Sequence, residues 1–183
     1  MKPPPIMHVI MSAQRLISNS ISVSCVLLLF LFPLFAAAQS PKTTDASKEI
    51  IIHQEVVFNA APDRVYDILL SSKKFSDCTK MSFDNFSATS AKIDPVAGGT
   101  FSVFDGHIFG RILELVPGKR IVEAWRVVDW PEGVYSIARF ELQTQGIGTK
   151  LSFDHIGFPA GLKEHLAEGW TQHYWDALKK YLQ

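Results

Sequence analysis

Six histidines and two cysteines are the side chains of this 183-residue sequence most readily used for metal binding or nucleophilic catalysis. His165 and His173 lie eight residues apart in a segment with helical spacing, which separates them by about 80° around the helix axis. Neither an H-E-x-x-H motif nor a closely spaced cysteine pair accompanies them, and no G-x-S-x-G motif is present. The sequence therefore predicts no metal site, no cofactor and no catalytic residue.

His155 is the histidine with the most informative surroundings, in the segment LSFDHIGF. Strand alternation places it on the same face as Leu151 and Phe153, so its ring is expected to point toward the terminal helix. The interpretation that we favour is a core histidine hydrogen-bonded to backbone or to Tyr174, because buried polar groups normally have partners. The alternative is a polar group that faces a ligand cavity.

Aromatic residues give the clearest indication of a binding site. Each has two interpretations, ordinary core packing or the wall of an apolar ligand cavity. Charged strand residues such as Glu123 and Arg126 are expected mostly on the solvated face, with one or two entering the cavity to fix a polar group of the ligand. The candidate ligand-binding residues are Phe101, Phe109, Trp125, Phe140, Phe153, His155, Trp170 and Tyr174.

The segment from Leu162 to Gln183 is predicted to be a long helix with one apolar face. Its interior Gly169 costs about 1 kcal/mol of helix propensity relative to alanine. We expect this glycine to let the helix approach a strand or the loop near Trp130, so that Trp170 projects into the space under the helix. The apolar stripe recurs every four residues, at Leu162, Leu166, Trp170, Tyr174, Leu178 and Leu182.

The elements that position these residues follow a simple order. A β-branched strand over 49–60 is followed by a helix that begins near Pro62 and by a second short helix over 73–79. Antiparallel strands joined by tight turns follow, with the strongest hairpin signal at Asp105-Gly106, before the terminal helix. Segregated strands and helices indicate one α+β domain over 49–183. The later strands are expected at 82–93, 100–104, 107–116, 120–128, 134–143 and 149–156.

The first 38 residues have the layout of a secretory signal peptide. An apolar run from Val26 ends in Ala36-Ala37-Ala38, and at 13 residues it falls short of the ~20 that span a bilayer. We expect cleavage before Gln39, a linker over 39–48, and export to the periplasm or the medium. An uncleaved membrane anchor is the alternative. Cys25 lies in the leader, and Cys78 is expected to be a small buried apolar residue.

The charge balance excludes some partners. Both leader charges are basic, so the mature chain has 16 basic and 18 acidic residues and a net charge of −2. Neither nucleic acid nor an anionic membrane surface is expected as a partner, since both select strongly basic proteins.

Four segments together resemble the family named for the activator of heat-shock protein 90 ATPase, within the START-like, birch-pollen-allergen-like superfamily. They are FNAAPDRVYDIL, GGTFSVFDGHIFGRILELVPGKRIVEAWR, GTKLSFDHIGFP and EGWTQHYWDAL. The resemblance implies a helix-grip fold, in which a curved antiparallel sheet of about six or seven strands wraps around the long carboxyl-terminal helix. It also implies a hydrophobic cavity between the sheet and that helix.

Three functions are compatible with that resemblance. The first, which we favour, is an exported non-enzymatic protein that binds a small apolar or amphipathic molecule in the cavity. The second is a cyclase- or aromatase-like enzyme that positions its substrate with His155, Tyr174 and Arg126. The third is a co-chaperone that stimulates a chaperone ATPase. A chaperone partner is not expected, because export would separate the chain from a cytosolic chaperone.

Overall fold

The structure, a computed structural model, describes residues 51–82 and 90–183. The predicted signal peptide (1–38), the cleavage site before Gln39 and the linker (39–48) lie outside these residues. Most of the weak strand predicted at 82–93 lies outside them too, and only its last two residues, Lys92–Ile93 (β2), form a described strand.

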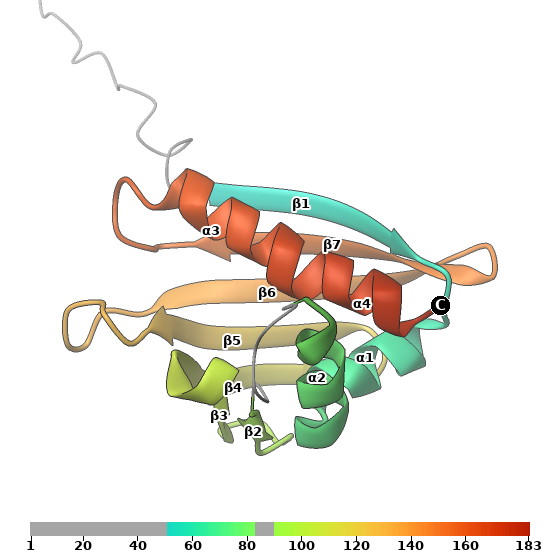
Figure 1. Ribbon diagram of the computed structural model, residues 1–183, viewed down its shortest axis with the longest axis horizontal. Helices are drawn as coiled ribbons and strands as arrows, with labels where there is room; N and C mark the ends of the chain where they lie inside the picture. Colours follow the sequence, from blue (N-terminus) through green and yellow to red (C-terminus); the bar gives the residue numbers. More distant parts are fainter. Residues whose placement is uncertain (1–50, 83–89) are drawn as a thin grey trace, which may run out of the picture. The chain divides into compact units, whose positions relative to one another are not determined.

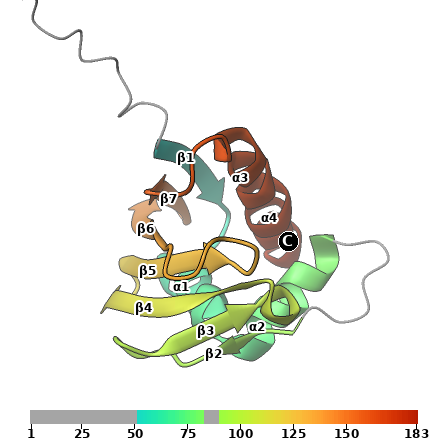
Figure 2. The same cartoon turned by 90° about the vertical axis from the view of Figure 1, so that its left-hand side faces the viewer.

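Seven antiparallel strands form one curved sheet, as expected from the sequence (Figure 1). The strand order is β1-β7-β6-β5-β4-β3-β2, so the first strand pairs with the last. Figure 2 shows the strands following one another from β1 to β2, with the terminal helix on one side. The remaining strands are β1 (Ile51–Phe58), β3 (Thr100–Val103), β4 (Ile108–Val116), β5 (Arg120–Val127), β6 (Ser136–Gln145) and β7 (Gly148–Ile156).

Two short helices follow β1, α1 (Pro62–Leu70) and α2 (Ser72–Thr79), and a single 3₁₀ turn, η1 (Lys80–Ser82), ends this segment. Pro62 occupies the first turn of α1, where its missing N–H costs nothing. The Ser71 side chain accepts a hydrogen bond from the Lys74 backbone N–H and caps α2. Within residues 51–82 and 90–183, no helix is long and apolar enough to cross a membrane.

The terminal helix runs as α3 (Lys163–Gly169), a π-helical segment η3 (Trp170–Trp175) and α4 (Asp176–Tyr181). In a regular helix, residues four apart drift by about 40° per step around the axis. The wider π turn offsets this drift, so that Trp170, Tyr174 and Trp175 are all buried against the sheet. The predicted long helix is therefore present, but it is not regular at its aromatic centre.

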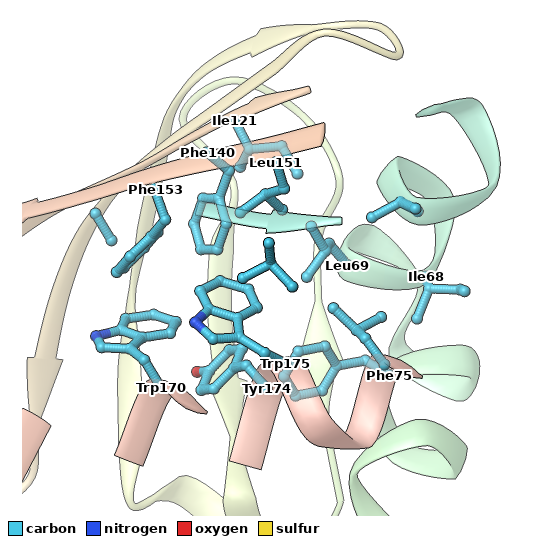
Figure 3. Packing of buried hydrophobic residues seen from close by; sticks show 14 of the residues in the cluster. Ile68, Leu69, Phe75, Ile121, Phe140, Leu151, Phe153, Trp170, Tyr174 and Trp175 are labelled. Atoms are coloured by element: carbon cyan, nitrogen blue, oxygen red, sulfur yellow. The ribbon is translucent and has the colours of Figure 1, made fainter. Parts of the chain in front are cut away.

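Strand register decides which side chains face the terminal helix, because directly opposed residues of antiparallel strands point to the same face. Phe140 is opposite both Ile121 and Phe153, and all three are buried. Trp125 is opposite Ser136 in β6 and Gly110 in β4. Figure 3 shows Phe140 and Phe153 reaching from the sheet toward Trp170, Tyr174 and Trp175 of the helix.

Candidate functional site

A pocket of about 420 Å³ lies between the terminal helix and the sheet. This volume falls within the range of small-molecule sites. Four aromatic rings form much of its wall: Phe104, Trp125, Trp170 and Tyr174. Asp105, His107, His165 and His173 also line it, and the first three of these are exposed to solvent. The pocket is thus apolar inside, with titratable groups toward solvent.

The β3–β4 hairpin brings Phe104 to the pocket through an unusual backbone. Its 3₁₀ turn, η2 (Phe104–Gly106), has positive φ at all three residues, 51° at Phe104, 56° at Asp105 and 91° at Gly106. Glycine adopts this region freely, but a non-glycine residue there costs roughly 1–2 kcal/mol. The sequence predicted the turn from Asp105-Gly106, but it did not predict the left-handed phenylalanine.

Gly169 does not act as the sequence suggested. A Cβ atom added there would meet nothing within 4 Å, and the residue has ordinary helical angles. The expectation that Gly169 permits a close approach to a strand or to the loop near Trp130 is therefore wrong. The glycine instead leaves room in the pocket wall, immediately before Trp170.

Beside the pocket, His155 and Trp170 join the helix to the sheet through buried hydrogen bonds. The Trp170 Nε1–H donates to His155 Nδ1 at 3.0 Å. His155 Nε2 lies 2.6 Å from the Ser136 hydroxyl, which donates to the Trp125 carbonyl at 2.9 Å. Because an indole N–H can only donate, Nδ1 must accept, and the neutral ring then carries its proton on Nε2.

His155 is consequently a core histidine whose partners are Trp170 and Ser136, in place of the backbone or Tyr174 partner expected from the sequence. It has no solvent exposure, and burial lowers its pKa from 6.5 to about 3. A second bond of the same kind lies nearby, where the Trp175 N–H donates to Gln54 Oε1 at 2.6 Å.

The structure brings together some of the candidate ligand-binding residues but not all of them. Trp125, Trp170 and Tyr174 line the pocket. Phe140 and Phe153 pack behind it, with ring centroids 5.8 Å and 4.3 Å from that of Trp170. Phe101 lines a separate gap of about 20 Å³ next to Tyr174.

Phe109 lies on the opposite face of the sheet, where it is opposite Arg126 in register. The Arg126 guanidinium carbon lies 5.2 Å from the Phe109 ring centre and 5.4 Å from that of Tyr135. Its Nη2 donates to the Trp130 carbonyl at 2.6 Å. Neither Phe109 nor Arg126 therefore lines the pocket, and the three side chains proposed for a cyclase-like enzyme do not converge.

Glu123 is one of the charged strand residues of which one or two were expected to enter the cavity, and it lies on the helix-facing side of the sheet, at the small gap. It alternates with Ile121 and Trp125 on that side of β5, although charged strand residues were expected mostly on the solvated face. The residue keeps some solvent exposure, but its side chain lines the small gap next to Tyr174, and desolvation there raises the pKa of its carboxyl group to about 8. The alternation with two large apolar residues was the signal that could have found it.

Tyr174 separates the pocket from this gap and lines both. Burial, then the charge of Glu123, raise the pKa of its hydroxyl, and the nearby Trp125 N–H opposes them weakly. That N–H is buried but lacks hydrogen-bond geometry to Tyr174 or to any other residue that the structure describes. Burial and the charge of His165 lower the pKa of His173 at the same pocket.

Residues 51–82 and 90–183 contain neither a candidate metal site nor a reactive thiol. No group of three or more His, Cys, Asp and Glu side chains in those ranges could hold a metal ion. Cys78 is buried, and burial raises the pKa of its thiol to about 12, so it is an unreactive core residue.

With the pocket, the helix and the sheet in view, the comparisons with known proteins give a consistent result. The family model described as "Activator of Hsp90 ATPase homolog 1-like protein" matches residues 59–183. The chain belongs to this family. The solved structure of an HSP90 activator from Plasmodium falciparum has a TM-score of 0.65 and 25% sequence identity, and it covers 73% of this chain and 96% of its own.

Other similar proteins give the same result. A Chromobacterium violaceum protein of solved structure is 27% identical, with a TM-score of 0.56 over 72% of this chain and 96% of its own. The human "Activator of 90 kDa heat shock protein ATPase homolog 1" is 32% identical over 95 residues, 52% of this chain and 28% of the relative. The mouse "Activator of 90 kDa heat shock protein ATPase homolog 2" is 26% identical over 134 residues, which are 73% of this chain and 38% of the relative. The chain thus spans roughly a third of the length of these curated relatives.

Proposed function

We propose that this chain is a non-enzymatic binding protein that holds a small apolar or amphipathic molecule in the pocket beneath its terminal helix. The observation that carries the proposal is a pocket of about 420 Å³ lined by Phe104, Trp125, Trp170 and Tyr174 beside Gly169. A position that leaves space in a largely apolar wall is what a ligand site requires and a packed core does not.

The arrangement of polar groups favours binding over the cyclase-like alternative. His155 is held neutral between Trp170 and Ser136, and Arg126 lies on the other face of the sheet. Tyr174 is the remaining candidate that lines the pocket. A single hydroxyl with a raised pKa orients a ligand more readily than it removes a proton from one.

Mass spectrometry under native conditions, together with solvent extraction of the purified protein, tests this proposal. We expect a co-purifying apolar molecule, or saturable binding of fatty acid, isoprenoid or aromatic probes, and the loss of both in Gly169→Leu. The matched control is Glu164→Leu, which adds similar bulk at an exposed position of the same helix. An empty protein that binds none of these probes would exclude the function.

Chaperone ATPase activation is the second candidate, because the relatives are named for that activity. It needs a protein-binding surface and does not need the pocket. Purified protein added to a chaperone ATPase assay distinguishes the two functions. Stimulation that persists in Gly169→Leu would favour the co-chaperone over the ligand carrier.

We further propose that the chain is exported and begins at Gln39 after cleavage. The support is the apolar run from Val26 and the small residues Ala36 and Ala38. Amino-terminal sequencing of protein from the medium or the cell envelope tests this. Full-length protein in the cytosol would refute it.

A further inference from the structure

The indole N–H groups of three buried tryptophans differ in whether they are used. Trp170 donates to His155 and Trp175 donates to Gln54. The Trp125 N–H, also buried, has no partner in the part of the chain that the structure describes. A buried donor without a partner destabilises the folded protein, because it has lost its hydrogen bond to water. Since Trp125 lines the pocket, a ligand atom that accepts a hydrogen bond would remove this destabilisation.

The Tyr174 hydroxyl is the second donor at this position. It lies near the Trp125 N–H, and its ring forms the wall between the pocket and the gap that holds Glu123. Glu123 makes no ion pair with any described residue, and burial raises the pKa of its carboxyl group to about 8, so that it keeps its proton at neutral pH. A protonated carboxyl donates a hydrogen bond, and Tyr174 lines the same gap as Glu123, close enough for the two groups to influence each other electrostatically.

Charge narrows the chemistry further. Neither a lysine nor an arginine lines the pocket or the gap. Of the pocket-lining histidines, His107 and His165 are exposed to solvent and burial lowers the pKa of His173. A carboxylate head group at the inner end would therefore be desolvated without a cation, which is costly. An uncharged oxygen that only accepts hydrogen bonds suits two neighbouring donors, whereas a plain hydrocarbon leaves the Trp125 N–H unpaired.

We propose that the inner end of the pocket binds the carbonyl oxygen of an otherwise apolar ketone, aldehyde or ester. Trp125 Nε1–H and the Tyr174 hydroxyl donate to that oxygen, and Glu123 is a positioning residue that donates to Tyr174 and keeps its proton directed at the ligand. This assignment rests on the proposed function, because it names the ligand class of the same pocket.

The test compares three probes of equal chain length: a methyl ketone with an isotope-labelled carbonyl, an n-alkane and a fatty acid. We expect the ketone to bind about tenfold more tightly than the other two, the effect of one or two hydrogen bonds. Infrared difference spectra should show the carbonyl band of the bound ketone at lower frequency than in hexane, because hydrogen bonding weakens the C=O bond.

Variants locate the donors. Trp125→Phe and Tyr174→Phe should each remove most of the difference in affinity between the ketone and the other probes. In each variant the carbonyl band should move part of the way back toward its frequency in hexane. Glu123→Gln, which can still donate, should retain both, whereas Glu123→Met should lose them. The matched controls are Trp175→Phe, which breaks the bond to Gln54, and Glu114→Gln, on an exposed carboxylate; both should keep the preference for the ketone.

The outcomes separate the carbonyl site from the pocket itself. Equal affinity for the ketone and the alkane, tighter binding of the fatty acid, or an unshifted carbonyl band would overturn the carbonyl site and leave the binding function standing. Binding of none of the three probes would overturn both. If a variant fails to fold, the band position and the probe preference of the wild-type protein decide the question.

Discussion

The two halves of the helix–sheet interface are built from the same residue types but differ in how completely their contacts are satisfied. In one half, His155, Ser136 and Trp170 form a chain of hydrogen bonds, and Phe153 fills the space behind them. In the other half, Trp125 has an unused N–H and Gly169 faces open space. We call the first half the seam and the second the pocket.

This difference shows that aromatic content alone does not distinguish a core from a binding site. Trp170 belongs to both halves, because its N–H bonds to His155 while its ring lines the pocket. The distinguishing features are a donor without an acceptor and a position without a side chain. The unused donor belongs to Trp125 in β5, and the position without a side chain is Gly169 at the end of α3.

The largest expected effect is in the seam. Trp170→Ala should lower the free energy of unfolding by about 3–5 kcal/mol, because it opens a cavity and leaves His155 without its donor. Denaturant titration measures the loss. Phe104→Ala, on the pocket side, should cost less than half as much, since its ring is half-buried. Equal losses would mean that the pocket is packed as tightly as the seam.

The second-largest expected effect is a loss of stability in acid, which arises from His155 in the seam. His155 has a folded-state pKa of about 3 against 6.5 when unfolded, so the unfolded chain binds the extra proton between these values. Stability should therefore fall as the pH drops below 6.5, by ~1.4 kcal/mol per pH unit or about 3 kcal/mol by about pH 4.5.

Denaturant titration at several pH values checks this slope. His155→Asn keeps an acceptor for Trp170 and should lose the corresponding part of the pH dependence. Other acidic groups titrate in both proteins, so the difference between the two profiles is the informative quantity. Identical profiles would mean that His155 titrates normally in the folded protein.

Raising the pH should also lower the free energy of unfolding, in this case through Glu123, whereas His155 acts when the pH falls. The pKa of Glu123 is raised to about 8 from 4.5, so the folded protein holds the proton longer than the unfolded chain. The stabilisation that comes from this raised pKa is fully present below pH 4.5 and is lost as the pH rises through 8. We expect a loss of about 1–2 kcal/mol, less than the full shift implies, because the residue keeps some exposure.

Glu123→Gln should abolish this decline, so that the variant gains on the wild type as the pH rises. Thermal melts from pH 5 to about pH 9 measure the gain. Glu141→Gln is the control, since Glu141 pairs with Arg120 and is not a pocket-lining residue. A decline that survives in Glu123→Gln would place its origin elsewhere.

The smallest expected effect concerns the open position in the pocket wall. Gly169→Ala should raise stability by about 0.5–1 kcal/mol, because alanine favours the helix and its Cβ meets no atom within 4 Å. Thermal melts measure this gain. Gly146→Ala, at a φ of +61°, should instead be destabilising. A destabilised Gly169→Ala would show that the pocket is narrower than 420 Å³ suggests.

The order of strands and helices was predictable because apolar periodicity and turn residues are local signals. His155 was assigned to the correct face because Leu151 and Phe153 alternate clearly with polar residues. In β5 and β4 both faces carry apolar residues, so alternation could not separate Glu123 from Arg126 or place Phe109. Burial on both faces removes the contrast on which such predictions depend.

The π-helical turn left one signal that the sequence analysis did not use. A stripe that repeats every four residues from Leu162 to Leu182 drifts too far around a regular helix to stay on one face. The pocket itself left no comparable signal, because an open volume depends on which contacts the fold fails to make. Gly169 was noticed for its helix propensity, and its surroundings gave it a different role.

The pairing of β1 with β7 has a consequence for the rate of folding. Ile51 is opposite Ile156, so the edge of the sheet closes only when residues about a hundred positions apart meet. Loop-closure entropy makes such contacts slow to form, and antiparallel domains rich in them fold in milliseconds to seconds. Every hairpin from β3 to β7 can form before β1 joins the sheet. During synthesis β1 therefore emerges first from the ribosome but is the last strand to be incorporated.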